Sequence, residues 1–294
     1  MIIIPEYNNA SSDNSTTNSI SGKCVIPSPA LILYIQGLTG TVMLPYVVLC
    51  LPANLWVMWL ITHGTKESLA AELFHLNTAI CETLFLLGSP LHLYCLFGPF
   101  CGPVFQILVA ELWVLVFFGR PLFQCSICVE RYLAVVQPLT FIRFKPLRYR
   151  VVFSGLMWFA ITINLLSIWT AVHSLSSIIA ITFFLTLSVI VFCCLSVIWS
   201  LKQPAPADTA RTGGNNMKRR AFNIFSLNLG IFLVTYLPTF VIVSLNNILS
   251  SNIFLYLFTP SSFLTVLGGI AQPLLYLHKA GKLHRTWVFT AAKP

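Results

Sequence analysis

The chain has 294 residues, of which 57% are hydrophobic and 9% are charged. An average soluble domain has about 25% charged residues, so this composition indicates a polytopic membrane protein. A net charge of +9 is also found in nucleic-acid-binding proteins. Here the basic residues follow a membrane pattern instead, and we expect no nucleic-acid partner.

Seven apolar runs are long enough to cross a bilayer as helices, which takes about 20 residues each. We therefore predict an all-α membrane protein with a seven-transmembrane helix bundle over residues 31–278. A disordered leader over residues 1–30 precedes the bundle, and residues 279–294 follow it. The seven runs cover approximately residues 33–62, 72–95, 101–135, 148–171, 175–201, 218–247 and 254–278.

The basic residues lie almost entirely on one side of these spans. Of the 17 lysines and arginines, Lys23 alone lies on the N-terminal side and Arg120 lies inside a span, which leaves 17 − 2 = 15 on the opposite side. The positive-inside rule then makes the N-terminus extracellular and the C-terminus cytoplasmic, as in a multi-pass plasma-membrane protein. Sequons at Asn9 and Asn14 agree with a glycosylated outer leader. The leader has no charged region followed by an apolar one, so we expect no cleaved signal peptide.

No enzyme, metal site or transporter is indicated. His75, His92, His173 and His278 are scattered in depth, and no nucleophile and base cluster together. No cysteine spacing fits zinc, and no internal repeat indicates a transporter. We expect no enzymatic activity, no metal and no cofactor.

A charged segment ends the third span. Glu130, Arg131 and Tyr132 follow one another at the cytoplasmic end of an apolar helix, where charges are costly without a partner or a function. With the Leu-Ala-Val-Val-Gln-Pro-Leu that follows, the segment resembles the Asp/Glu-Arg-Tyr motif of rhodopsin-like G-protein-coupled receptors. In that family the acid holds the arginine until helix six swings outward, so the resemblance implies signalling from an extracellular ligand to a heterotrimeric G protein.

Further motifs of that family follow in order along residues 31–289. Trp158 stands at the family's position in the fourth span. Phe-x-x-Thr-Tyr-x-Pro in the sixth span resembles Phe-x-x-Cys-Trp-x-Pro, and Gln-Pro-x-x-Tyr in the seventh resembles Asn/Asp-Pro-x-x-Tyr. Residues 279–294 resemble the family's amphipathic helix along the inner membrane face, with a very short tail. The resemblance assigns coupling and activation to Glu130, Arg131, Tyr132, Phe232, Tyr236, Pro238, Gln272, Pro273 and Tyr276.

An internal ion pair is expected between the second and third spans. Glu82 lies near the middle of one span and Arg120 near the centre of the other. At about 100° per residue, Arg120, Arg131 and Trp113 share one face of a regular helix. The resemblance places Glu82 and Arg120 at an interior pocket that holds sodium in many family members, and we expect the arginine to replace that ion. Backbone carbonyls or water remain alternative partners for Arg120.

The chain also departs from the family pattern. Thr186 replaces a proline and Cys194 a tyrosine in the fifth span, and Gln272 replaces the usual Asn or Asp. The loop between the fourth and fifth spans is very short and lacks the family's cysteine. The chain thus resembles an atypical, orphan-like member, and a degenerate receptor acting as a scaffold or decoy remains an alternative.

The extracellular side carries three cysteines, Cys24, Cys95 and Cys101, in an oxidising compartment. An odd number predicts one disulfide and one free thiol. Because the family's loop cysteine is missing, Cys101 has Cys24 or Cys95 as its partner, and we assign the pair Cys24–Cys101.

The ligand is weakly encoded. Trp113 stands where amine receptors of the family have an aspartate, which disfavours an amine. The seventh span has no interior lysine, which disfavours a retinal Schiff base. The side chains expected to line the pocket are neutral, so we expect a small apolar or lipid-like ligand. They are Tyr94, Trp113, Tyr236 and Asn246.

Overall fold

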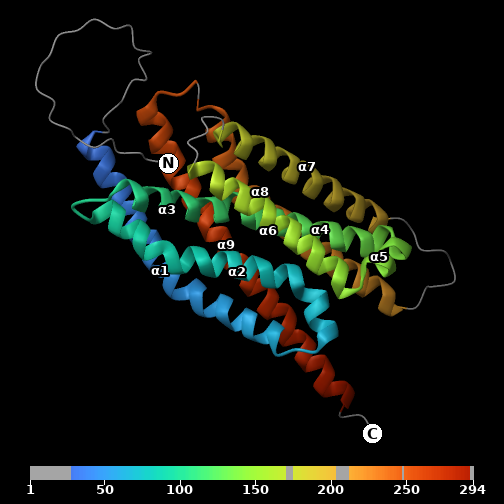
Figure 1. The fold of residues 1–294 in the computed structure, drawn as a ribbon. Coiled ribbons are helices and arrows are strands. Elements are labelled where there is room, and N and C mark those ends of the chain that lie inside the picture. Colours follow the sequence, from blue (N-terminus) through green and yellow to red (C-terminus); the bar gives the residue numbers. More distant parts are fainter. Residues whose placement is uncertain (1–27, 170–174, 203–211, 247, 292–294) are drawn as a thin grey trace, which may run out of the picture.

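The computed structural model describes residues 28–169, 175–202, 212–246 and 248–291 (Figure 1). Within these ranges the regular structure is entirely helical, and the axes of most helices are roughly parallel to one another (Figure 1). The helices are α1 (Pro29–Thr62), α2 (Lys66–Phe97), α3 (Pro103–Val114), a π-helical turn η1 (Leu115–Gly119), α4 (Arg120–Val136), α5 (Pro138–Phe144), α6 (Leu147–Trp169), α7 (Leu175–Lys202), α8 (Thr212–Ser244) and α9 (Ser251–Ala291).

Five helical segments in the described part of the chain are long and apolar enough to cross a membrane. They lie in α1, α2, the continuous α3–η1–α4 rod, α6 and α9. Shorter apolar segments, residues 183–197 and 229–244, lie in α7 and α8, where two further spans are predicted. The outward faces carry large exposed apolar side chains such as Leu33, Val48 and Phe159. Such faces suit lipid, because they would aggregate in water.

Local sequence explains several helix ends. Ser28 begins α1: its hydroxyl accepts a hydrogen bond from the Leu31 amide at 3.3 Å, and Pro29 occupies a first-turn position that needs no amide donor. The backbone of α2 leaves helical geometry at Glu72, near the start of the apolar segment 71–97.

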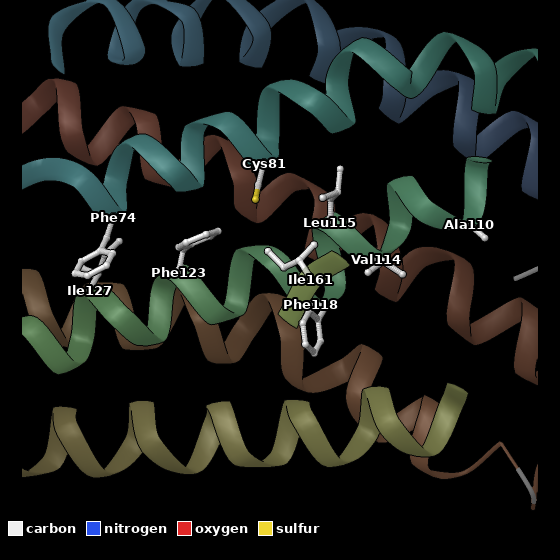
Figure 2. Packing of buried hydrophobic residues seen from close by; sticks show 9 residues of the cluster. All are labelled: Phe74, Cys81, Ala110, Val114, Leu115, Phe118, Phe123, Ile127 and Ile161. Atoms are coloured by element: carbon white, nitrogen blue, oxygen red, sulfur yellow. The ribbon is translucent and has the colours of Figure 1, made fainter. Parts of the chain in front are cut away.

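The α3–η1–α4 rod is the centre of the packing. Figure 2 shows one core cluster, in which side chains of the rod meet α2 and α6. Other residues of the rod join a second cluster with α1, α2 and α9, and a third with α7 and α8. The residues of the first cluster are Phe74, Cys81, Ala110, Val114, Leu115, Phe118, Phe123, Ile127 and Ile161.

Pro121 accounts for the π-turn inside this rod. Proline has no amide hydrogen and its ring crowds the preceding turn, so an α-helical ladder cannot continue through it unchanged. The chain widens instead, and the Arg120 amide bonds to the Leu115 carbonyl, five residues earlier. The expected common face of Trp113 and Arg120 assumed regular helix geometry, and η1 interrupts that regularity.

The expected boundary at residues 278–279 stays a prediction, although no break in the backbone marks it. The backbone of α9 continues as one helix from Ser251 to Ala291, and no separate helix begins after Leu277. Neither Lys279 nor Gly281 removes an amide donor, and one glycine costs a helix only about 1 kcal/mol, so the backbone ladder can persist.

Candidate functional site

The polar centre of the bundle is built around Arg120. Its guanidinium forms an ion pair with Glu82 of α2, and both side chains are 3% exposed. The Tyr46 hydroxyl of α1 donates to the other carboxylate oxygen of Glu82. Arg120 Nη1 donates to the Thr265 carbonyl oxygen of α9 at 2.7 Å. One buried cation thereby connects four helices. A buried charge requires such neutralisation and hydrogen bonding.

Gly269 lets α9 approach this ion pair closely. A Cβ atom there would overlap the Tyr46 hydroxyl and would lie 2.7 Å from Glu82 Oε1 and 2.8 Å from Arg120 Nη2. Carbon atoms do not tolerate such distances, so any larger residue would displace the network. Glycine is therefore required here by the close approach of backbone to buried charge.

A small cavity of about 10 Å³ adjoins the ion pair, which is room for about one water molecule. Gln272 of α9 lines it and donates through its amide to Gln124 Oε1 of α4. The Tyr276 ring, one turn further along α9, lies 5.7 Å from the His75 ring. The cavity is lined by Asn54, Val57, His75, Thr78, Ala79, Glu82, Arg120, Gly269, Gln272, Pro273 and Tyr276.

The charged segment at the end of α4 forms an ion pair with a neighbouring helix. Glu130 forms an ion pair with Arg150 of α6 at 2.9 Å, and these side chains are 13% and 6% exposed. The expected hold of Glu130 on Arg131 therefore stays a prediction, because the ion pair of Glu130 in this structure is formed with Arg150. Adjacent residues on a helix point about 100° apart, whereas Arg150 reaches Glu130 from a neighbouring helix. The Tyr132 ring packs against Phe192 of α7.

Trp158 anchors α6 to α2. Its indole Nε1 donates to Asn77 Oδ1 at 2.8 Å, and Asn77 Nδ2 donates to Ser154 Oγ at 3.1 Å. The side chains of Asn77 and Ser154 are both buried, so the bonds satisfy groups that water cannot reach. The structure thus gives Trp158 a structural role between two helices.

The segment of α8 before Pro238 is held by aromatic packing and by the hydroxyl group of Tyr236. Tyr236 is 4% exposed, stacks on Phe232 with ring centroids 4.7 Å apart, and packs against Phe183 of α7. Its hydroxyl donates to the Val116 carbonyl of η1 at 3.2 Å. Pro238 lies two residues further along α8, inside the helix.

The four residues expected to line a ligand pocket have different surroundings. Tyr94 is 50% exposed and packs on α3, and Asn246 is exposed after the end of α8. Trp113 packs against rings of α2 and η1, whereas Tyr236 packs within α7 and α8. Their joint role in ligand binding stays a prediction, because their ring contacts do not join them.

The disulfide assignment is corrected. Cys95 and Cys101 are bonded to each other, with Cα atoms 4.9 Å apart, so Cys101 does not pair with Cys24. Cys95 lies in the last turn of α2 and Cys101 in the short turn before α3, and this turn brings them within bonding distance. Cys24 and the sequons at Asn9 and Asn14 lie outside the described residues.

Four residues that contact the polar centre or the end of α4 are absent from the sequence-based assignment: Tyr46, Thr265, Gly269 and Arg150. A tyrosine inside an apolar span was a usable signal, because a buried phenol needs a hydrogen-bond partner. Thr265 contributes its backbone carbonyl, which no side-chain pattern reveals. Arg150 was counted only among the basic residues on one side of the spans, because it directly precedes the apolar part of its helix.

The chain matches no family model. It is similar to human proteinase-activated receptor 3, with 28% identity over 51% of this chain and 37% of that receptor. It is 24% identical to human G-protein coupled receptor 35 over 76% of this chain and 75% of that receptor. It is 29% identical to a purinoceptor of Xenopus laevis over 39% of this chain and 22% of that protein. The chain therefore covers little more than a third of the first of these relatives, and its similarity to a G-protein coupled receptor extends over three quarters of its length.

Proposed function

We propose that this chain is a G-protein-coupled receptor of the plasma membrane, with seven membrane-spanning helices, an extracellular N-terminus and a cytoplasmic C-terminus. The similarity to human G-protein coupled receptor 35 over 76% of the chain carries the proposal. The apolar helices and the Glu130-Arg131-Tyr132 segment at the end of α4 support it. In this function the segment of α8 before Pro238 swings outward and opens a site for a heterotrimeric G protein.

The ligand we propose is small and apolar or lipid-like, and Trp113, Tyr236, Tyr94 and Asn246 remain the proposed contacts. The aromatic rings around Trp113 support an apolar ligand, because they offer apolar faces. Glycosylation at Asn9 and Asn14 belongs to the same proposal.

A degenerate receptor fold is the second proposed function. It is favoured by the ion pair between Glu130 and Arg150, which gives the motif acid a partner other than Arg131. It is also favoured by Cys194, a buried free thiol at the position where the family has a tyrosine hydroxyl.

One experiment separates the two functions. G-protein activation in cells is compared for the wild type, Arg131→Ala and the control Arg143→Ala, which removes an exposed charge of α5. Surface expression is measured for each variant. We expect basal or ligand-driven signal that Arg131→Ala abolishes and Arg143→Ala retains. Normal surface expression with no signal from the wild type across a ligand panel would favour the scaffold or decoy.

A further inference from the structure

A carbonyl group in η1 is left without a backbone donor. In an α-helix the Val116 carbonyl would accept from the Arg120 amide, but that amide bonds to the Leu115 carbonyl. In a π-helix it would accept from residue 121, which is proline and has no amide hydrogen. Val116 is 1% exposed. A buried carbonyl in this position needs a donor from elsewhere in the bundle.

The hydroxyl of Tyr236 supplies that donor from α8, at 3.2 Å. Tyr236 lies two residues before Pro238, on the part of α8 that must move if the helix bends at this proline. Pro121 of α4 removes the amide donor that the Val116 carbonyl would otherwise have, and the Tyr236 hydroxyl of α8 replaces that donor.

A second hydroxyl holds the neighbouring residue of α8. Thr265 of α9 donates through Oγ1 to the Thr235 carbonyl at 2.7 Å. The Thr265 backbone carbonyl in turn accepts from Arg120 Nη1 at 2.7 Å. Thr239 Oγ1 lies 2.9 Å from Thr265 Oγ1 and donates to the Ser261 carbonyl at 2.8 Å. These bonds connect α4, α8 and α9 on both sides of Pro238.

We propose that the hydroxyls of Tyr236 and Thr265 form a two-point latch that holds α8 closed at its Pro238 hinge. Outward movement of α8 breaks both bonds and leaves the Val116 and Thr235 carbonyls without these partners. Arg120 fixes the position of Thr265 by donating to its backbone carbonyl. Pro121 has no amide hydrogen, so the Val116 carbonyl accepts from the Tyr236 hydroxyl instead. The signalling consequence of the latch rests on the proposed receptor function, but its mechanical effect does not.

The test measures the position of α8 directly. Spin labels on cysteines introduced at Val152 of α6 and Leu227 of α8, which are 63% and 50% exposed, report their separation in the full chain in lipid nanodiscs. Chain without these cysteines corrects for labelling of native thiols. Tyr236→Phe removes the first hydroxyl and keeps the ring. Tyr256→Phe is the control, since this tyrosine is 55% exposed and its ring stacks on Tyr34.

We expect Tyr236→Phe to raise the ratio of open to closed molecules about fivefold, the effect of one buried hydrogen bond. Thr265→Val should act in the same direction. Its control is Thr39→Val, because the buried Thr39 hydroxyl bonds only within its own helix, to the Ile35 carbonyl. Distance distributions of Tyr236→Phe and Thr265→Val that equal those of their controls would overturn the latch.

A double-variant comparison tests the role of Pro121. Pro121→Ala restores an amide donor, so Tyr236→Phe in that background should change the open-to-closed ratio less than about twofold. An equal effect in both backgrounds would overturn the assignment of the freed carbonyl. Nucleotide exchange on a G protein is measured with the same samples. A shift in distance without any exchange would support the latch and count against the receptor function.

Discussion

Replacing Arg120 with methionine tests the internal ion pair, because it removes the charge and keeps a long apolar side chain. Among the described residues, Glu82, which is 3% exposed, would then keep the Tyr46 hydroxyl as its one side-chain donor. Two unit charges about 4 Å apart attract by about 4 kcal/mol at an effective dielectric constant of about 20. Breaking a buried pair by removing one partner costs about 3–5 kcal/mol. We expect Arg120→Met to lower the free energy of unfolding by about that amount and to reduce surface expression.

The double variant Glu82→Gln/Arg120→Met removes both charges and should recover most of this loss, because a neutral replacement of a buried pair is nearly as stable as the pair. Exchanging the charges, Glu82→Arg with Arg120→Glu, should likewise restore surface expression lost by either single reversal. The exposed control Arg143→Met should stay within about 0.5 kcal/mol of the wild type. Thermal unfolding in detergent and surface labelling in cells measure these effects. An Arg120→Met variant as stable as the control, or a double variant as unstable as Arg120→Met, would show that the ion pair does not stabilise the bundle.

Two further substitutions test contacts around this centre and at the end of α4. Gly269→Ala should lower the free energy of unfolding by about 1–3 kcal/mol through overpacking, whereas Gly155→Ala, where a Cβ meets open space, should be neutral or stabilising; equal unfolding midpoints would contradict the close approach of α9. Arg150→Met should cost about 3 kcal/mol by leaving Glu130 without its partner on α6, whereas the exposed Arg148→Met should cost less than about 0.5 kcal/mol. If both arginine variants unfold at the same temperature, the Glu130–Arg150 pair does not stabilise the protein.

The apolar helical character and the approximate ends of most helices followed from the amino-acid sequence alone, whereas α9 extends beyond its expected end. Runs of apolar residues with few charges can satisfy their backbone groups in lipid only as helices, so composition and length carry this information. The depths of Glu82 and Arg120 followed from their places in these runs. The cysteine pairing did not, because an odd number of cysteines left two partners for Cys101, and the turn between α2 and α3 selected Cys95.

Which groups meet inside the bundle was established only by tertiary packing. Arg120 and Thr265 are 145 residues apart, and Tyr236 and Val116 are 120 apart, so no local pattern relates them. Helical periodicity also assumes one constant angle per residue, and the π-turn before Pro121 changes that angle within the central rod. Contacts such as Glu130–Arg150 depend on how neighbouring helices are placed side by side, and that placement is set by packing across the whole bundle.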